Sequence, residues 1–494
     1  MNVHKHSYAR GLFLLVLAVG VVFTAFAPAQ VTLTQLSQDT FTDSPSQHAT
    51  EVEPGAFSWG STIVTAFQVA RIYGGGGADI GFATSTNGGT TWTNGYLPGI
   101  TIYQGNGTND AASDAAVAYD ALHNVWLISV LPIGNNTSVA VSRSTDGINW
   151  SNPIWVTTLG SPDKNWIVCD NTATSKYYGH CYSEWDDTMN GDLIEMSTST
   201  DGGLTWSQEM HTAGFDYGIG GEPVVTPKGK VIVPISGFNG DVIAFSSING
   251  GKSWTRAVNI ASDNSHYEAG GLRSPGLLSS AIDAKGTVYV AWPDCRFRTN
   301  CAENDIVYST STTGAKWSAV QRVPIDATTS TVDHFITGLA IDPATSGTKA
   351  HLALAYYYYP VSNCGSCQLY AGFIQSSTAG KTWSAPETLA GPMQLSWLPQ
   401  TFSGYMVADY ISVGFANGKA FPIFAAAQAK NGSLFQQAIY TTAAGQYASQ
   451  PEEEYLTAEG DLPVPNAHSD HGPREFLDQD NRIPVSAKRP PATD

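Results

Sequence analysis

Short apolar runs alternate with polar, glycine-rich turns along most of the chain. Typical runs are Gly229–Ile235 and Asp241–Ser246, which a few polar residues separate. Runs of this length, bounded by Gly, Pro, Asn or Asp, predict short β-strands. No long segment with a helical period follows residue 29. The pattern therefore predicts an all-β fold.

One segment recurs six times with nearly the same residues. Each copy runs from Ser through Asp, Asn or Thr and then Gly to Trp, and successive tryptophans lie 48 to 66 residues apart. Ser and Asp side chains can bond neighbouring backbone groups, and Gly supplies the positive φ of a tight turn. A repeat of this length suits one four-stranded sheet per copy. The copies are Ser85–Trp92, Ser144–Trp150, Ser199–Trp206, Ser247–Trp254, Ser311–Trp317 and Ser376–Trp383.

These segments resemble the Asp-box (BNR) repeats of sialidases and related propellers. The resemblance covers residues 30–445 and implies a single β-propeller of four-stranded blades, with each box in the turn between the third and fourth strands. After the sixth box, we expect three more strands over residues 410–415, 420–427 and 433–441. Val31–Leu36 can supply their fourth strand and close a ring of seven blades. The alternative is six blades, with these strands completing the first.

The two ends of the chain lack this pattern. Lys5 and Arg10, an apolar run and a small-residue motif at Ala27–Ala29 predict a signal peptide over residues 1–29, with an uncleaved anchor as the alternative. Residues 446–494 are rich in charge and Pro, which predicts a disordered, acidic tail. We therefore expect a secreted protein, extracellular or periplasmic, that has no membrane contact after signal removal.

The charge balance narrows the class of partner. The chain has 24 Lys and Arg against 42 Asp and Glu. Residues 1–29 contain Lys5 and Arg10 but no Asp or Glu, so their removal makes the net charge more negative. An acidic protein is a poor partner for nucleic acid or an anionic membrane, because both need a basic footprint. A glycan or polysaccharide is the partner that we expect instead.

Six cysteines, an even number, suit disulfides in an exported protein. They fall in three local pairs, and closing a small loop costs the least chain entropy, although other pairings are open. A zinc site is the alternative for the last pair. The expected pairs are Cys169 with Cys181, Cys295 with Cys301, and Cys364 with Cys367.

Candidate chemistry is expected on the side of the propeller opposite the boxes. First strands line the central channel of a propeller, and they start on that opposite side. Polar residues at those starts should form a ring around one mouth, where their carboxylates could hold Ca²⁺, although no cofactor is required. The ring contains Asp110 or Asp114, Asp163 with Lys164, Glu222, Arg273, Asp333 with His334, and Asp409 with Tyr410.

Loops between second and third strands add charged residues to this mouth. Aromatic rings pack on sugar faces and carboxylates bond hydroxyls, so the mouth is expected to bind a glycan. An Asp opens the third strand in four of the predicted blades, which favours a structural role for Asp79, Asp192, Asp241 and Asp305. Arg322 adjoins a fourth strand and is expected on the box side. The expected substrate-binding residues are Arg273, Arg296, Arg298, Asp163, Asp294, His334 and Asp409.

Two segments resemble the catalytic parts of sialidases. Glu222 stands just before a strand pair, and Tyr410 lies in a segment similar to the one that holds the sialidase nucleophile. By this resemblance, Tyr410 attacks the anomeric carbon, Glu222 takes its proton and Asp114 protonates the leaving oxygen. The Phe-Arg-Ile-Pro segment that opens the sialidase arginine clamp is absent, and Arg71 is its nearest counterpart.

Three functions compete at this point. A sialidase-like glycoside hydrolase needs two carboxyl groups in reach of one sugar, or a Tyr–Glu pair. A non-catalytic propeller that binds glycan or protein needs only a shallow aromatic site. A polysaccharide lyase needs a Tyr or His base, for which His334, His266 and Tyr267 are the candidates.

Overall fold

The computed structural model describes Met1, residues 31–135 and residues 137–447. Within these ranges the chain is all-β, with short 3-10 turns at Thr188–Asn190, Ala269–Gly271, Thr299–Cys301, Gly347–Lys349 and Leu395–Trp397. The predicted signal peptide and nearly all of the predicted tail lie outside the described residues. Among the described residues, no helix is long enough and apolar enough to span a bilayer.

Among the described residues, most strands pair antiparallel with their neighbours in chain order, and we divide them into seven consecutive groups. Single residue pairings join the first, second and seventh groups into one 13-stranded sheet. Group one is β2 (Ser46–Trp59), β3 (Thr62–Ile72), β4 (Gly77–Ser85) and β5 (Thr93–Tyr96). Group two is β6 (Ala111–Asp120), β7 (Val125–Ile133), β8 (Val139–Ser144) and β9 (Ile154–Thr157). Group three is β10 (Pro162–Cys169), β11 (Cys181–Asp187), β12 (Leu193–Ser199) and β13 (Met210–His211). Group four is β14 (Gly218–Ile219) and β15 (Val224–Val225), which both pair with β16 (Val231–Gly237), then β17 (Asp241–Ser247) and β18 (Val258–Ser262).

The remaining groups follow the same order. Group five is β19 (Ser279–Ile282), β20 (Val288–Asp294), β21 (Asp305–Ser311) and β22 (Gln321–Arg322). Group six is β23 (Asp333–Ile341), β24 (Leu352–Tyr359), β25 (Gln368–Ser376) and β26 (Glu387–Gln394). A small hairpin, β27 (Gln400–Thr401) and β28 (Gly404–Tyr405), precedes group seven. Group seven is β29 (Ser412–Ala416), β30 (Lys419–Ala427), β31 (Gln437–Thr442) and β1 (Leu33–Gln35).

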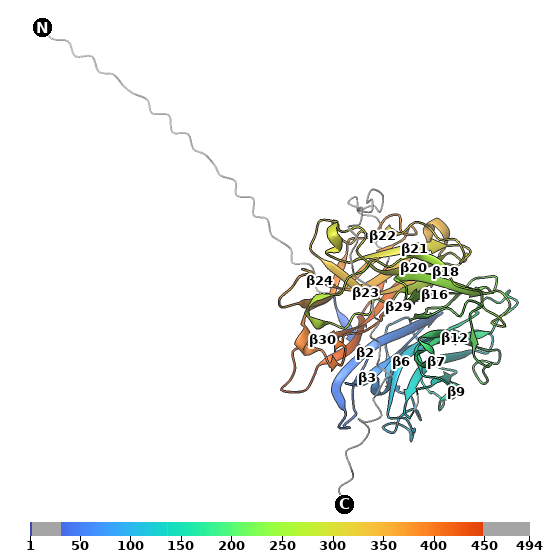
Figure 1. Cartoon of the computed structure of the whole chain (residues 1–494). Coiled ribbons are helices and arrows are strands. Elements are labelled where there is room, and N and C mark those ends of the chain that lie inside the picture. Colours follow the sequence, from blue (N-terminus) through green and yellow to red (C-terminus); the bar gives the residue numbers. More distant parts are fainter. Residues whose placement is uncertain (2–30, 136, 448–494) are drawn as a thin grey trace, which may run out of the picture. The chain divides into compact units, whose positions relative to one another are not determined.

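Group seven joins the two ends of the described chain. β1 pairs antiparallel with β31, which is the pairing that the sequence predicts for Val31–Leu36. β2 also meets β31, and Figure 1 shows blue β2 beside orange β30. The last described strand, β32 (Gln446–Tyr447), pairs with β30, so regular pairing runs into the segment that the sequence assigns to the tail.

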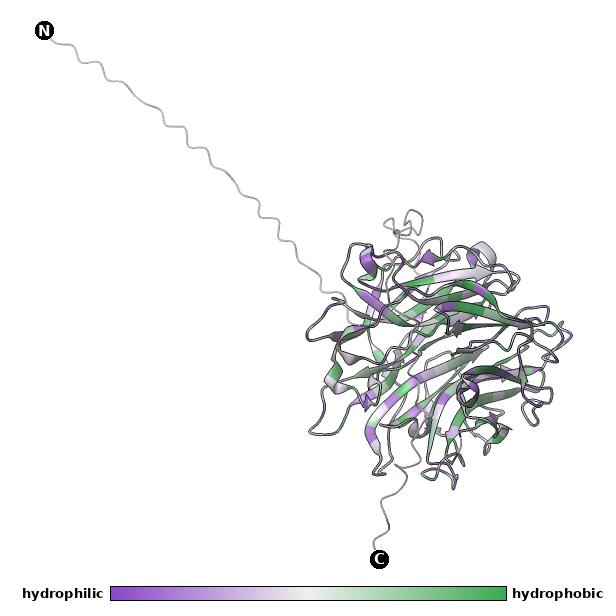
Figure 2. Ribbon diagram, viewed as in Figure 1, coloured by the Kyte–Doolittle hydropathy of each residue, from purple (hydrophilic) through white to green (hydrophobic). Residues whose placement is uncertain are grey.

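The first strands of successive groups contact one another in chain order. β2 contacts β6, β6 contacts β10, β10 contacts β15, β15 contacts β19, β19 contacts β23 and β23 contacts β29. β29 in turn contacts β2. Apolar side chains fill the space between neighbouring groups, and Figure 2 shows hydrophobic residues concentrated along the strands.

All six repeated segments form the turn between a third and a fourth strand, and one hydrogen bond recurs in each. The Ser hydroxyl accepts a bond from the Gly N–H three or four residues later, at 2.8 to 3.0 Å. In the second repeat, backbone and side-chain donors of Asn149 lower the pKa of Asp146 below its ordinary range. Because the same bond recurs in all six repeats, these hairpins have a structural role.

Three disulfides form the pairs that the sequence predicts: Cys169 with Cys181, Cys295 with Cys301, and Cys364 with Cys367. Among the described residues no cysteine is free, so the zinc alternative is wrong.

Four first strands share an irregular feature. Glu53, Asp114, Lys164 and Ile336 have φ between 45° and 56° although none is Gly. Each lies where the register with the second strand shifts, in β2, β6, β10 and β23. A left-handed non-glycine residue costs about 1–2 kcal/mol, and such strain gathers at functional sites. Three of the four side chains are charged, and they meet.

Candidate functional site

Lys164 joins carboxylates from three separate segments. Its Nζ lies 2.8 Å from Oδ2 of Asp409, 3.3 Å from Oδ1 of Asp114 and 3.3 Å from Oε1 of Glu53. Because one nitrogen contacts all three groups, the carboxylates lie within a few ångströms of one another. All four side chains are at most 2% exposed.

Arg273 completes this group, which we call the Lys164 cluster (Glu53, Asp114, Lys164, Arg273 and Asp409). Its Nε donates to Oδ1 of Asp409 at 2.8 Å, and its Nη2 contacts Oδ2 of the same carboxylate. The formal charges are three negative and two positive. Burial acts to raise the pKa of Asp409, but Arg273 and Lys164 hold it well below its ordinary value. Burial, together with Asp409 and Asp114, raises the pKa of Glu53 well above its ordinary value despite Lys164.

Tyr410 follows Asp409 and borders the Lys164 cluster. The Lys164 Nζ lies 5.8 Å from the centre of the Tyr410 ring. The Trp166 ring packs edge-on against the Tyr410 ring, with ring centres 5.3 Å apart. The Tyr410 hydroxyl donates to the Ala115 carbonyl at 3.4 Å. Burial raises the pKa of Tyr410 well above its ordinary value, and Glu53 and Asp114 raise it further. The phenol is therefore neutral at neutral pH.

Glu222 lines the same narrow cavity as Tyr410 and Lys164. The Ser280 N–H donates to its Oε2 at 2.7 Å and the Ser279 hydroxyl donates at 3.1 Å. Burial raises the pKa of Glu222 to about 8, although these two donors oppose the shift. Tyr410 and Glu222 thus line one cavity with Lys164, and Asp114 contacts Lys164, whereas the Glu222 carboxylate itself is bonded to Ser279 and Ser280.

Glu184, in β11, is a further acidic group beside this cavity. Its side chain is fully buried, and neither of its carboxylate oxygens has a hydrogen-bond partner among the described residues. Burial raises its pKa well above the ordinary value. A Cβ at Gly221 would lie 2.6 Å from the Glu184 carboxyl carbon, so the Glu184 carboxyl group packs directly against the residue before Glu222.

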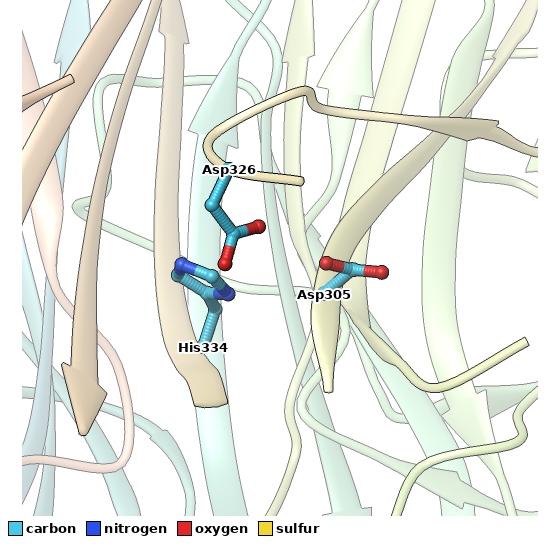
Figure 3. Close-up of side chains that lie close together, drawn as sticks. All are labelled: Asp305, Asp326 and His334. Atoms are coloured by element: carbon cyan, nitrogen blue, oxygen red, sulfur yellow. The ribbon is translucent and has the colours of Figure 1, made fainter. Parts of the chain in front are cut away.

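A second group of charged residues surrounds His334 (Figure 3). Ligand atoms of Asp305, Asp326 and His334 lie within 4.8 Å of one another, which is a spacing that could suit a metal ion. However, the Arg298 Nη2 lies 2.5 Å from Asp305 and 2.7 Å from Asp326, and the Arg322 Nη2 lies 2.9 Å and 2.5 Å from the same two groups. Two guanidiniums already balance two carboxylates, so these residues do not fit a cation.

The contacts of Arg322 correct its expected position. A fourth strand begins at the box hairpin and ends beside the start of the third strand, so Arg322, in β22, reaches Asp305 at the start of β21. Arg322 therefore lies on the side of the predicted mouth and not on the box side. We call Arg298, Asp305, Arg322, Asp326 and His334 the Asp305 cluster.

The three arginines expected to bind substrate have different carboxylate partners. Arg273 bonds Asp409, Arg296 bonds Asp294 at 2.7 Å, and Arg298 bonds Asp305 and Asp326. No shared carboxylate links them. Asp163 accepts the Lys164 N–H at 2.8 Å and thereby supports the strained backbone of Lys164.

The histidine candidates for a lyase base are also engaged. His266 contacts Asp333 through Nε2 at 3.1 Å and the Tyr267 carbonyl through Nδ1 at 3.0 Å. His334 is buried, and its Nδ1 contacts the Asn304 carbonyl at 3.3 Å. Burial lowers the pKa of His334.

Known proteins add limited information. No family profile and no curated protein matches this sequence. The chain is similar to the Hadza microbial sialidase Hz136 (14% identity, 80% of this chain, 66% of that one, TM-score 0.41). It is also similar to the NanB sialidase from Streptococcus pneumoniae (14%, 83% and 70%, 0.42) and to a mutant of AofleA from Arthrobotrys oligospora (11%, 71% and 90%, 0.43). At these identities and TM-scores the likeness assigns no function.

Proposed function

We propose that the protein is a secreted, sialidase-like glycoside hydrolase, built as a closed seven-bladed β-propeller. The seven strand groups would be the blades, and the cyclic contacts of their first strands support closure. The domains would be a signal peptide over residues 1–29, the propeller over 30–445 and a tail over 446–494. The three disulfides agree with an oxidising compartment outside the cytosol.

One observation carries the catalytic proposal. Lys164 holds acidic groups from three segments in contact, next to a buried tyrosine and a glutamate that line one cavity. Clustered ionisable groups with shifted pKa values and strained backbone are typical of active sites. The backbone strain at Asp114 and Lys164 aims both side chains at the cluster.

In the proposed step, the Tyr410 oxygen bonds the anomeric carbon as the glycosidic C–O bond breaks. Glu222 takes the Tyr410 proton, and Asp114 gives a proton to the leaving oxygen. The Oδ2 of Asp114 has no hydrogen-bond partner among the described residues, so it is available to hold that proton. In the second step, the ionised Asp114 takes a proton from the water that attacks the anomeric carbon, and Glu222 returns its proton to the Tyr410 oxygen as the bond between tyrosine and sugar breaks.

No cofactor enters this step. Ca²⁺ at the Lys164 cluster would have to displace Lys164 and Arg273 from the carboxylates that they bind. We therefore propose that the hydrolase needs no metal.

The test is a screen of the purified mature protein against sialosides and a panel of polysaccharides, at pH 5 to 9. Glu222→Gln, Tyr410→Phe and Asp114→Asn should each lower kcat about 10²–10⁴-fold. Tyr73→Phe, at an exposed tyrosine, is the matched control and should retain full activity. Because Glu222 must be ionised to act as a base, wild-type kcat/KM should rise as the pH approaches about 8.

A second function, binding of a glycan without cleavage, is favoured by the burial of the Lys164 cluster. Its carboxylates are at most 1% exposed and already bonded to Lys164 or Arg273. If the wild type binds a glycan but cleaves nothing, this function replaces the first. If the wild type cleaves a substrate and the three variants match it, the assigned residues are wrong.

A further inference from the structure

A pocket of about 620 Å³ lies between groups three and four. It shares no lining residue with the cavity of Glu222 and Tyr410. The turns that line it, at Gly191 and at Phe238–Asn239, connect second strands to third strands, so the pocket opens at the end of the sheets opposite the repeated hairpins. This volume is typical of sites for small ligands. We call it the Phe215 groove, after an aromatic side chain that lines it.

Two aromatic rings in this groove face solvent. Phe215 is 56% exposed and Tyr217 is 47% exposed, although burial of such rings would be favourable. The backbone of Phe215 is also strained, with φ of 50°. Its ring stacks on His211, with ring centres 4.2 Å apart and planes 27° apart. The chain therefore holds one face of a large ring outward at an energetic cost.

The segment that carries these rings is fixed before any ligand arrives. The Asp216 carboxylate accepts the Thr212 hydroxyl at 2.6 Å and the Ala257 N–H at 2.7 Å, which ties the segment to the start of β18. Tyr217 pairs with Leu193 at the start of β12. A platform that is already ordered loses little entropy on binding.

Hydrogen-bonding groups surround the platform. The lining includes Asp192, Asn239, Asp241 and Asn259, whose carboxylates accept bonds and whose amides donate and accept them. The Oδ1 atom of Asp241 is inaccessible to solvent and has no hydrogen-bond partner among the described residues. Aromatic faces beside mixed acceptors and donors match the apolar face and equatorial hydroxyls of a sugar ring.

The charges of the groove restrict the sugar further. Its ionisable lining residues, Asp192, Asp216 and Asp241, are all acidic, so a carboxylated or sulfated sugar would meet like charges. A cation is not favoured either. Within the described part of the chain, these three carboxylates do not converge closely enough to share a metal ion. We propose that the Phe215 groove binds a neutral oligosaccharide, at a site separate from the Lys164 cluster.

Calorimetric titration of the mature protein with cellohexaose, maltohexaose and chitohexaose tests this proposal. At least one should bind, and Phe215→Ala and Tyr217→Ala should each raise its Kd about tenfold or more, because truncated aromatic anchors lose most of their contact. Asp241→Asn should weaken binding less. Tyr73→Ala, at a tyrosine with 53% exposure elsewhere, is the matched control and should leave Kd unchanged.

Two further arms separate this groove from the proposed active site. Glu222→Gln should bind the same hexasaccharide with unchanged Kd, whether or not the protein proves to be a hydrolase. Sialyllactose should not bind at the groove, so its titration should be indifferent to Tyr217→Ala. The proposal is overturned if none of the three hexasaccharides binds, or if binding is equal in Phe215→Ala, Tyr217→Ala and wild type. Circular dichroism checks that each variant is folded.

Discussion

Two buried clusters of charged residues differ in how completely their charges are paired. In the Asp305 cluster, two arginines face two aspartates, and each Nη2 contacts both carboxylates. In the Lys164 cluster, three acidic groups face two cations. Each cluster has a carboxylate oxygen without a hydrogen-bond partner among the described residues, Oδ2 of Asp305 in the first and Oδ2 of Asp114 in the second.

The backbone conformation also differs between the two clusters. Glu53, Asp114 and Lys164 all have positive φ, whereas Asp305, at the start of β21, lies in a regular ladder opposite Asp294. A charge-balanced cluster on regular strands is expected to stabilise the fold, and a cluster with an excess of acidic groups on strained strands is the better candidate for chemistry. This contrast predicts that the two clusters respond differently to mutation and to pH.

Arg298→Ala should have the largest effect on stability. The Arg298 side chain is fully buried, and its loss leaves Asp305 and Asp326 facing each other with only Arg322 between them. Breaking a buried ion pair by removing one partner costs about 3–5 kcal/mol, which urea unfolding at pH 7 would measure. Arg296→Ala is the control, because Arg296 is 14% exposed and should cost less. Equal losses in both variants would contradict a special role for the Asp305 cluster.

Glu222→Gln should change the pH dependence of stability. Burial raises the folded-state pKa of Glu222 to about 8, so the folded state binds its proton more tightly than the unfolded state. This contribution is present below the unfolded pKa and is lost as the pH rises through about 8. Between pH 5 and 8, wild type should lose about 3 kcal/mol more than Glu222→Gln. Parallel curves for the two proteins, measured by urea unfolding, would exclude a strongly shifted Glu222.

The repeated parts of the fold could be predicted from sequence because their interactions are local. Ser199 and Gly203 form the hairpin bond within one turn, so the six turns could be found from residue types alone. Even the long-range pairing of β1 with β31 follows from counting strands in the last group. The local disulfides follow from spacing in the same way.

The candidate site was only partly predictable, because its contacts cross between groups. Asp114, Lys164, Arg273 and Asp409 were found as polar residues at the starts of first strands. Glu53 was missed, although it precedes the first repeat much as Asp114 precedes the second. That parallel was the available signal. Glu184 lies in β11, which is buried throughout although three of its residues are acidic, and no pattern in this strand distinguishes a buried acid from an exposed one.

Lys164→Met should lower the free energy of unfolding by a moderate amount, which sharpens the contrast between the two clusters. Arg273 still holds Asp409, and the raised pKa of Glu53 means that this group need not be charged. Mainly Asp114 then loses its partner, at a cost of about 2 kcal/mol in urea unfolding. Lys164→Arg should retain most of the stability. A loss as large as that in Arg298→Ala would show that the Lys164 cluster is equally a structural device.

Added metal should have the smallest effect, and it tests why the Asp305 cluster is not a metal site. A Zn²⁺ site in the native state would raise stability by about 2.7 kcal/mol at a hundred times its Kd. We expect no measurable rise in wild type, because Arg298 and Arg322 occupy the carboxylates. In Arg298→Ala one guanidinium is gone, so Zn²⁺ should restore part of the lost stability through Asp305, Asp326 and His334. Stabilisation of wild type that Asp305→Asn abolishes would instead mean that metal displaces the arginines.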